Sequence, residues 1–302
     1  MRAVSLVLLA GCGRVGFDAR DGGLVVDTLD GPAATNCFDR WRGGVPPLTM
    51  PQLIVDDGAS EHDPMLSPDG LRLYYTTDRD GPYRTYYTER PSLAGNFFER
   101  GLATDLPDVP RANFVFLDDE TIYSTDLAAT DNYDITLYAR TGTTSPFTAF
   151  SDPGISVLNS AASDLDVYVS PDTLSLYFAR YVGTNDFDIY RSSRPTSSVA
   201  WATPSPIPAL AATGVAELDP YVTPDGLTML YSALSPAPQR EYVTTRASTS
   251  DEFAPGTPID LGGNTSSNHD GVLSPNGCEL YFSSTRIDGS DSVFFATVLP
   301  KP

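Results

Sequence analysis

The chain has 302 residues, and its 39 Asp and Glu outnumber its 19 Lys and Arg, for a net charge of −20 at pH 7. Nucleic-acid binding requires a basic surface, and electrostatic adsorption to anionic lipid requires basic segments, so this composition argues against both. A strongly acidic balance also keeps an exported protein soluble.

The first twelve residues resemble a bacterial lipoprotein signal. Arg2 precedes a short apolar run, which ends in Leu-Ala-Gly-Cys at residues 9–12 and is similar to a lipobox. The resemblance implies that residues 1–11 are a signal peptide and that Cys12 becomes the lipid-bearing N-terminus. The alternative is a chance cysteine after a small apolar stretch. No other stretch approaches the roughly 18 apolar residues of a membrane helix, so we expect membrane contact only through the lipid.

Residues 12–46 are rich in Gly, Asp and Ala and show little apolar periodicity. This composition is typical of a flexible tether. Gly13, and not Asp, follows the lipobox cysteine, which by resemblance to enterobacterial sorting favours the outer membrane. We therefore expect an exported protein that is lipid-anchored to the outer membrane and faces the periplasm or the cell surface.

Four copies of one short phrase recur through the rest of the chain. They begin at Asp63, Asp166, Asp219 and Asp270, and these positions are 103, 53 and 51 residues apart. The wide first interval has room for one more copy, and a degenerate one begins at Asn113. Five repeats of about 52 residues with strand-like content are typical of a β-propeller.

Each repeat contains signals for four strands. A short apolar strand leads into a Ser/Thr-Pro turn, in which proline presets φ at the second position. A stronger apolar strand, a polar loop and a third strand follow, and a Pro-rich stretch then leads to a weak fourth strand. The pattern predicts four-stranded blades. It also predicts almost no helix after the leader, because no segment shows a sustained 3.6-residue apolar period.

The last repeat ends early, since only four residues follow Val298. Blade five therefore lacks a fourth strand of its own, while residues 48–55, before the first repeat, have the pattern of an unpaired fourth strand. We expect this segment to dock on the last blade, because docking closes the ring and removes two exposed sheet edges. The predicted fold is all-β: a five-bladed propeller over residues 47–300, closed by an N-terminal strand.

Two sets of aspartates recur with the repeat. Asp69, Asp172 and Asp225 lie in the turns, and the four phrase-initial aspartates begin the innermost strands. Residues that an architecture repeats are typically structural, and aspartate caps turns by accepting backbone N–H bonds, so we assign both sets this role. Five-bladed propellers also house glycoside hydrolases that use inward carboxylates. Catalysis requires two carboxylates in different environments, however, and symmetric copies argue against that.

The two histidines of the chain, His62 and His269, each stand just before a repeat aspartate. Blades one and five adjoin in a closed ring, so we expect these equivalent side chains to be neighbours at the channel mouth. With nearby aspartates they offer ligands for a metal ion, and the Asp/Asn/Gly loops resemble calcium-ligand chemistry. The alternative is two polar residues on surface loops and a protein without a cofactor.

The remaining cysteines, Cys37 and Cys278, form an even pair if Cys12 carries lipid in an oxidising compartment. Cys278 begins the second strand of the last blade, and ring closure brings the chain just after Cys37 to that same blade. A disulfide there would fasten the closure point. The alternative is that Cys278 only replaces the Leu found at that position in other repeats.

The phrase Asp-x-x-x-Ser-Pro-Asp-Gly-x-x-Leu-Tyr-Phe, followed in one repeat by Asp188-Ile189-Tyr190, resembles the WD-like propeller repeat of TolB-type proteins. The resemblance covers about residues 48–298. TolB is similar in carrying such a propeller but adds an N-terminal α/β domain where this chain has its tether, so no TolB partner carries over. The resemblance implies a lipid-anchored envelope propeller that serves as a binding or scaffold module without catalysis, for an unidentified envelope protein or glycan. The alternative is a carbohydrate-active propeller hydrolase.

Overall fold

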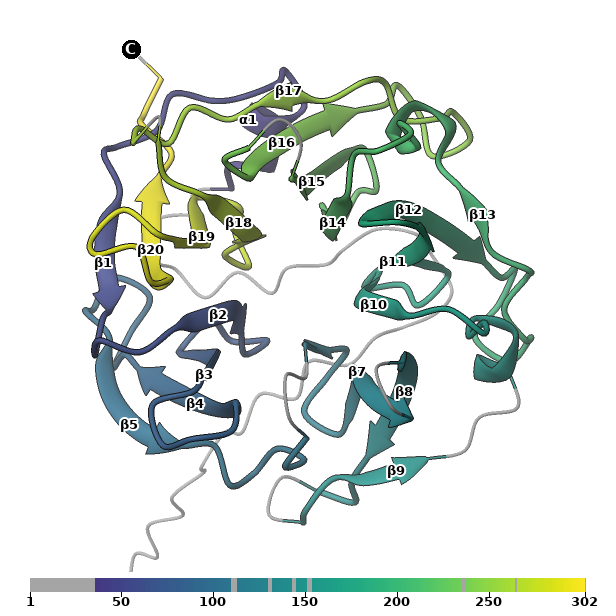
Figure 1. The fold of residues 1–302 in the computed structure, drawn as a ribbon, viewed down its shortest axis with the longest axis horizontal. Coiled ribbons are helices and arrows are strands. Elements are labelled where there is room, and N and C mark those ends of the chain that lie inside the picture. The colour runs from purple at the N-terminus through teal and green to yellow at the C-terminus, as the bar shows by residue number, and fades with distance from the viewer. Residues whose placement is uncertain are drawn as a thin grey trace, which may run out of the picture. The chain divides into compact units, whose positions relative to one another are not determined.

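Five antiparallel sheets, each of four strands, surround a central channel in the computed structural model of the protein (Figure 1). The predicted five-bladed propeller is therefore confirmed. Among the described residues, no helix is both long enough and apolar enough to cross a membrane. The structure describes residues 36–109, 113–129, 132–142, 145–150, 154–234, 237–263 and 265–301.

Blades one to four each follow the chain from the channel outwards. Blade one contains β2 (Glu61–Leu66), β3 (Arg72–Thr77), β4 (Arg84–Glu89) and β5 (Phe98–Leu102). Blade two contains β6 (Phe114–Phe116), β7 (Thr121–Ala129), β8 (Asn132–Ala139) and β9 (Thr148–Phe150). Blade three contains β10 (Asp164–Val169), β11 (Ser175–Gly183), β12 (Asp186–Ser193) and β13 (Ser205–Pro206). Blade four contains β14 (Glu217–Val222), β15 (Thr228–Ala233), β16 (Arg240–Thr245) and β17 (Thr257–Pro258).

Blade five takes its outermost strand from the N-terminal side of the chain. It contains β18 (Asn268–Leu273), β19 (Glu279–Ser284), β20 (Ser292–Thr297) and β1 (Gln52–Val55). In the antiparallel pair of β1 and β20, Leu53 lies opposite Phe294 and Val55 lies opposite Val293. The predicted closure of the ring by the segment before the first repeat is therefore confirmed.

The repeated turn after each innermost strand is held by its own side chains. In blade one, the Ser67 hydroxyl donates to Asp69 at 2.6 Å, and the Leu71 N–H donates to the same carboxylate at 3.0 Å. Gly70 has a φ of +69°, which glycine adopts without a steric penalty. An arginine after the third strand then donates from Nε to the turn carbonyl and lies over an aromatic ring. These pairs are Arg90 with Phe97, Arg140 with Phe147, Arg194 with Trp201 and Arg246 with Phe253.

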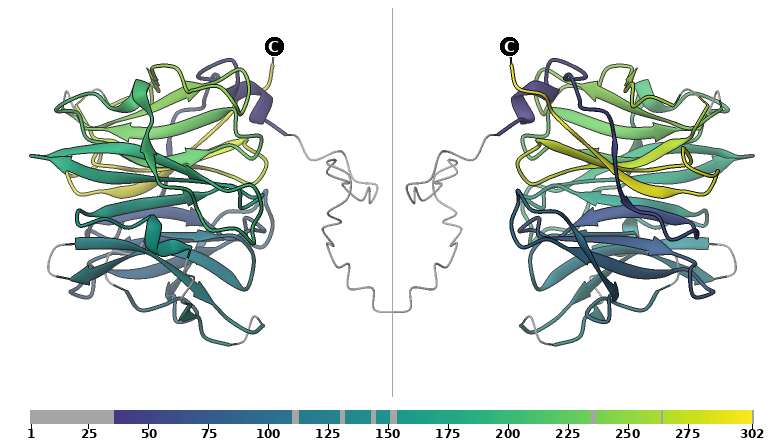
Figure 2. Two further views of the ribbon diagram at one scale, coloured as in Figure 1. Left: turned by 90° about the vertical axis from the view of Figure 1, so that its right-hand side faces the viewer. Right: turned by 90° about the vertical axis from the view of Figure 1, so that its left-hand side faces the viewer.

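Blade five has Val298 at the arginine position, and the N-terminal segment supplies a replacement. The helix α1 (Phe38–Trp41) packs on the turn between β18 and β19, where the Trp41 indole N–H donates to the Gly277 carbonyl at 2.9 Å. Trp41 is fully buried in an apolar cluster shared by blades four and five. Figure 2 shows α1 close to the C-terminal end, and Arg40 donates to the Leu299 carbonyl there. The only other helical segments among the described residues are single 3₁₀ turns, η1 (Ile155–Val157) and η2 (Pro208–Leu210).

One domain boundary differs from the sequence prediction. The composition predicts a tether that reaches residue 46, but the compact unit is Thr35–Pro302, and Cys37, Phe38 and Trp41 are buried in it. The physical reason is that these side chains cover the blade whose own sequence stops short. The predicted signal peptide, the lipidation site Cys12 and tether residues 12–35 lie outside the described residues.

Candidate functional site

The innermost strands β2, β6, β10, β14 and β18 surround the channel (Figure 1). We call the end that holds Asp63, Asp166, Asp219 and Asp270 the carboxylate mouth. We call the other end, which holds Pro68, Pro171, Pro224 and Pro275, the proline mouth. A cavity of about 350 Å³ lies between them. Among the residues that line the cavity, carboxylates are found at one end only.

A β-bulge places each repeat aspartate on the channel. The strand register shifts across this position in β2, β10, β14 and β18. The four aspartates have φ values between 51° and 59°, a left-handed conformation that Asp tolerates better than most residues. A bulge re-aims a side chain, and the left-handed backbone at the bulge accounts for the preference for Asp at this position.

The aspartates bind one another around the ring. The backbone N–H of Asp219 donates to Asp166 at 3.4 Å, that of Asp270 donates to Asp219 at 3.4 Å, and that of Asp63 donates to Asp270 at 3.1 Å. Blade two has Asn113 at the equivalent position, which also lines the cavity. Each of these acceptor carboxylates therefore ties its blade to the next, which gives these residues a structural role.

The same aspartates nevertheless differ in charge state. Burial and the nearby Asp63 and Asp270 raise the pKa of Asp166 to about 7. Burial, followed by Asp270 and Asp166, raises the pKa of Asp219 well above its usual range. Burial alone would raise the pKa of Asp270 as well, but the charge and hydrogen bond of His269 lower it below its usual range. The ring thus contains carboxyl groups in unlike environments, which repeat symmetry did not predict.

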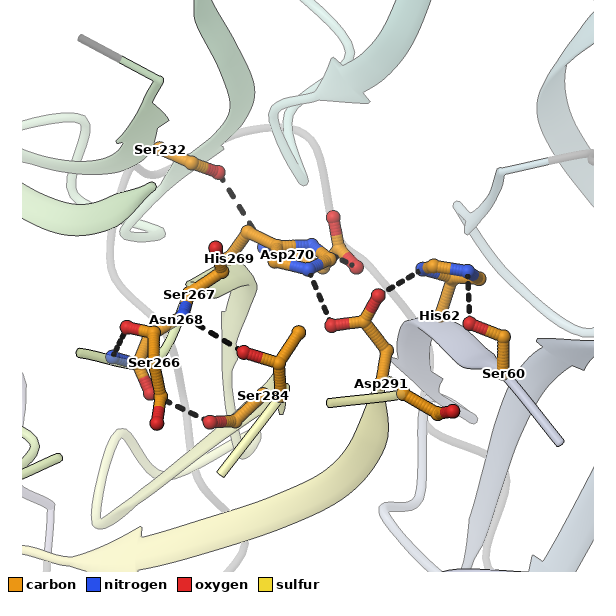
Figure 3. A network of polar contacts seen from close by, with 12 residues as sticks. Ser60, His62, Ser232, Ser266, Ser267, Asn268, His269, Asp270, Ser284 and Asp291 are labelled. Atoms are coloured by element: carbon orange, nitrogen blue, oxygen red, sulfur yellow. Dashed lines mark hydrogen bonds and ion pairs between the residues drawn. The ribbon is translucent and has the colours of Figure 1, made fainter. Parts of the chain in front are cut away.

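The two histidines are neighbours, as their repeat positions predict, with ring centroids 5.9 Å apart. Figure 3 shows both rings directed at Asp291, which precedes β20. His269 is buried between Asp270 and Asp291, at 2.8 and 2.9 Å. Burial opposes protonation there, but the two carboxylates outweigh it and raise the pKa of His269 well above its usual range.

Three further residues of this region were not predicted from the sequence. Asp291 comes from a loop, the Ser232 hydroxyl on β15 donates to Asp219, and Glu241 on β16 accepts the Gly271 N–H at 2.7 Å. Glu241 is fully buried, and its second carboxylate oxygen has no hydrogen-bond partner among the described residues. Burial raises the pKa of Glu241 well above its usual range, with Asp219 and Asp270 adding to the effect. These residues lie on second and third strands or loops, where the repeat phrase gives no signal.

The wall of the cavity is largely apolar and aromatic. Phe116, Tyr168 and Tyr221 line it together with valine and leucine side chains of the innermost strands. Tyr168 and Tyr221 meet edge to face, with ring centroids 5.1 Å apart. A concave apolar surface with a few converging polar groups is the usual form of a small-ligand site.

The other predicted residues lie at the proline mouth. Asp69, Asp172 and Asp225 each accept a Ser or Thr hydroxyl within their own turns. Cys37 and Cys278 are joined by a disulfide, with Cα atoms 4.9 Å apart. The Cys37 N–H donates to the Asn276 carbonyl of the blade-five turn. None of these groups faces the carboxylate mouth, so the channel ends divide the predicted residues into two sets.

Comparison with solved structures finds the same fold in a BT0996–RGII complex and in an endo-arabinase, and a weaker alignment with TolB. A structure of a BT0996–RGII complex aligns over 87% of this protein and 95% of the solved one, with 13% identity and a TM-score of 0.60. An endo-arabinase from Bacteroides thetaiotaomicron aligns over 84% and 98%, with 14% identity and a TM-score of 0.54. TolB from Acinetobacter baumannii aligns over 81% and 56%, with 14% identity and a TM-score of 0.44.

These similarities establish the propeller fold. No protein-family model matches the chain. No curated protein matches it either. At 13% and 14% identity, the first two alignments show the fold alone.

Proposed function

We propose that the protein acts on carbohydrate, with a glycan bound in the central channel at the carboxylate mouth. The observation that carries this proposal is a ring of carboxylates at one end of an otherwise apolar cavity. Asp63, Asp219 and Asp270 line that cavity, and its volume of about 350 Å³ falls within the range of small-ligand sites. A short stretch of a sugar chain fits such a space.

The lining favours a neutral glycan. Ionised carboxylates accept hydrogen bonds, which sugar hydroxyl groups donate, while Tyr168 and Tyr221 offer flat amphipathic rings. Uronic acids and other anionic sugars would meet repulsion from the aspartates and from a chain of net charge −20. The proposed substrate class is therefore an uncharged polysaccharide or oligosaccharide.

The ring also offers an acid and a carboxylate for hydrolysis. Asp166, whose pKa is raised to about 7 by burial and by Asp63 and Asp270, is protonated in a large share of molecules near neutral pH. Asp270, held by His269 at 2.8 Å, is the ionised partner. Glycosidases use such a pair, with one carboxyl as general acid and the other as base or nucleophile. We assign Asp166 and Asp270 these roles.

A second candidate is a glycan-binding module without catalysis. The hydrogen bonds that the aspartates accept from the next blade favour it, because a carboxylate committed to the backbone is less free to reach a glycosidic oxygen. Both candidates place the glycan in the same cavity, and they differ only in whether a bond is broken.

The experiment compares binding with cleavage. Purified protein is titrated calorimetrically with arabinan and xylan oligosaccharides, with polygalacturonate as the acidic control, and released reducing ends are measured in parallel. We expect a neutral glycan to bind and be cleaved, with Asp166→Asn losing about 100-fold or more of the rate but little affinity. The matched variant Asp69→Asn, at the proline mouth, should behave as wild type. Binding without cleavage selects the second candidate, and no binding to any neutral glycan overturns the proposal.

We also propose that the protein is held at the outer membrane by lipid on Cys12. The composition of residues 12–35, rich in Gly, Asp and Ala, is typical of a flexible tether between such an anchor and a folded domain. Cys12→Ala should move the protein to the soluble fraction and abolish labelling by a fatty-acid probe. A variant that stays membrane-bound and labelled would contradict the anchor.

A further inference from the structure

Two histidines and one aspartate meet where the first and last blades adjoin (Figure 3). His62 belongs to β2, His269 belongs to β18, and Asp291 lies in the loop before β20. One nitrogen of each imidazole and one carboxylate oxygen lie within 4.8 Å of one another. Donors from both blades therefore converge on one point.

We propose that His62, His269 and Asp291 bind a transition-metal ion, with zinc as the best fit, and that the ion links blade one to blade five. This site adjoins the glycan site proposed above, because His269 also pairs with Asp270, but its test does not depend on any glycan.

The second nitrogen of each imidazole already has a partner, which aims the first nitrogen at Asp291. His269 Nδ1 pairs with Asp270 at 2.8 Å, and His62 Nε2 pairs with the Ser60 hydroxyl at 3.0 Å. Metal-binding histidines are typically held in this way by a carboxylate or another polar group behind the ring. The nitrogens left to bind metal are His269 Nε2 and His62 Nδ1.

The Asp291 carboxylate faces both imidazoles. His269 Nε2 lies 2.9 Å from one Asp291 oxygen, and His62 Nδ1 lies 3.5 Å from the other. Ligands about 2.0–2.1 Å from a tetrahedral zinc lie about 3.3 Å apart, and the three donors, which lie within 4.8 Å of one another, need only a small adjustment to reach that spacing. Two imidazoles and one carboxylate suit zinc better than calcium, which takes six to eight oxygen ligands. Three protein ligands leave the fourth position to water.

A buried acidic residue lies beside the cluster. Glu61 is fully buried, and neither of its carboxyl oxygens has a hydrogen-bond partner among the described residues. Its backbone N–H donates to the Asp291 carbonyl at 2.9 Å, which places it next to the proposed ligands. The cluster therefore lies against a polar group that no donor among the described residues satisfies.

The test is calorimetric titration of chelator-treated protein with zinc chloride, together with thermal unfolding. We expect one zinc to bind per chain and to raise the melting temperature. Asp291→Asn should lower the affinity at least tenfold and remove the thermal shift. Asp288→Asn, an exposed acidic residue of the same loop, is the matched control and should bind as wild type. If Asp291→Asn does not fold, His62→Gln replaces it.

Three results would overturn the proposal. The first is a failure of wild-type protein to bind zinc, and the second is an unchanged affinity in the ligand variants. The third is tight calcium binding that Asp219→Asn abolishes and Asp291→Asn does not, since that result would place a cation on the aspartate ring. Weaker zinc binding at lower pH would support the site, because protons compete for the imidazole nitrogens.

Discussion

Both mouths of the channel are formed by the same sequence repeat, but the aspartates at each mouth make different contacts. At the proline mouth each turn aspartate binds groups of its own turn, for example Asp69 with Ser67 and Leu71. At the carboxylate mouth an aspartate binds the backbone of the next blade, as Asp270 does with Asp63. The first kind of contact is complete within one repeat, although Asp225 also accepts a hydrogen bond from Arg42 at 2.7 Å, whereas the second depends on the neighbouring blade. At the carboxylate mouth, chemical differences between copies therefore follow from the neighbours of each aspartate.

The mouths also close the ring by different means. The proline mouth is fastened by the disulfide of Cys37 and Cys278 and by α1, which buries Phe38 and Trp41 in an apolar cluster. The carboxylate mouth joins blades one and five through His62, Asp291 and His269, and these contacts are polar. We therefore expect stability to depend mainly on the proline mouth and pH response to depend on the carboxylate mouth.

The largest effect is expected from Trp41→Ala. Trp41 is fully buried and replaces the arginine contact that blade five lacks, so truncation leaves a cavity and an unpaired Gly277 carbonyl. Changes of this kind cost about 3–5 kcal/mol, measured as a loss of unfolding free energy in urea. Met50→Ala, in the same N-terminal segment but 77% exposed, should stay within about 0.5 kcal/mol. Equal losses of unfolding free energy in the two variants would show that α1 does not stabilise the closed ring.

Loss of the disulfide should come next. The bond joins residues 241 positions apart, and constraint of so long a loop in the unfolded chain stabilises by about 2–4 kcal/mol. Cys278→Ser should lower the unfolding free energy by this amount, and reducing agent should do the same to wild type and nothing further to the variant. Mass spectrometry of an unreduced digest should recover the two cysteines in one linked peptide. Two free thiols in the denatured, unreduced protein would contradict the bond.

The propeller could be predicted because its signals are local and repeated: the turn chemistry, the strand pattern and the early end of the last repeat. The position of α1 could not, since Phe38 and Trp41 are isolated aromatics in a Gly- and Asp-rich segment. The pairing of the histidines followed from ring closure. Asp291 and Ser232 lie outside the repeated phrase, and only the fold brings them to the channel. The pKa values of the aspartates differ because the charge and hydrogen bond of His269 lower the pKa of Asp270. Treating the repeats as identical copies does not predict this difference.

A smaller effect that varies with pH is expected at Glu217, at the start of β14. Burial, with Asp188 and Asp186, raises its pKa to about 8, and one of its carboxylate oxygens has no partner among the described residues. The folded state thus favours the neutral form of Glu217 more than the unfolded chain does. The contribution of neutral Glu217 to the unfolding free energy is therefore fully present below the ordinary pKa of about 4.5. It is lost as pH rises towards 8, by up to about 1.4 kcal/mol per pH unit.

Glu217→Gln removes this dependence. The unfolding free energy of the variant should increase relative to that of wild type as pH rises from 5 to about 8, and measurements at several pH values across that range check this. Asp164, the equivalent residue of blade three, is paired with Arg180, so Asp164→Asn is the matched comparison and should lose stability instead. A difference between Glu217→Gln and wild type that does not change with pH would show that Glu217 ionises normally.

The smallest effect is expected at the turn aspartates, where the repeat contains its own control. Blade five has Asn276 in place of aspartate, and its amide oxygen accepts the Ser274 hydroxyl at 2.8 Å and the Cys278 N–H at 3.1 Å. The turn therefore needs an acceptor but not a charge. Asp69→Asn should change the unfolding free energy by less than about 0.5 kcal/mol, whereas Asp69→Ala should cost about 1 kcal/mol by removing both hydrogen bonds. A loss in Asp69→Asn as large as that in Asp69→Ala would mean that charge matters at the proline mouth too, and the division between the two mouths would fail.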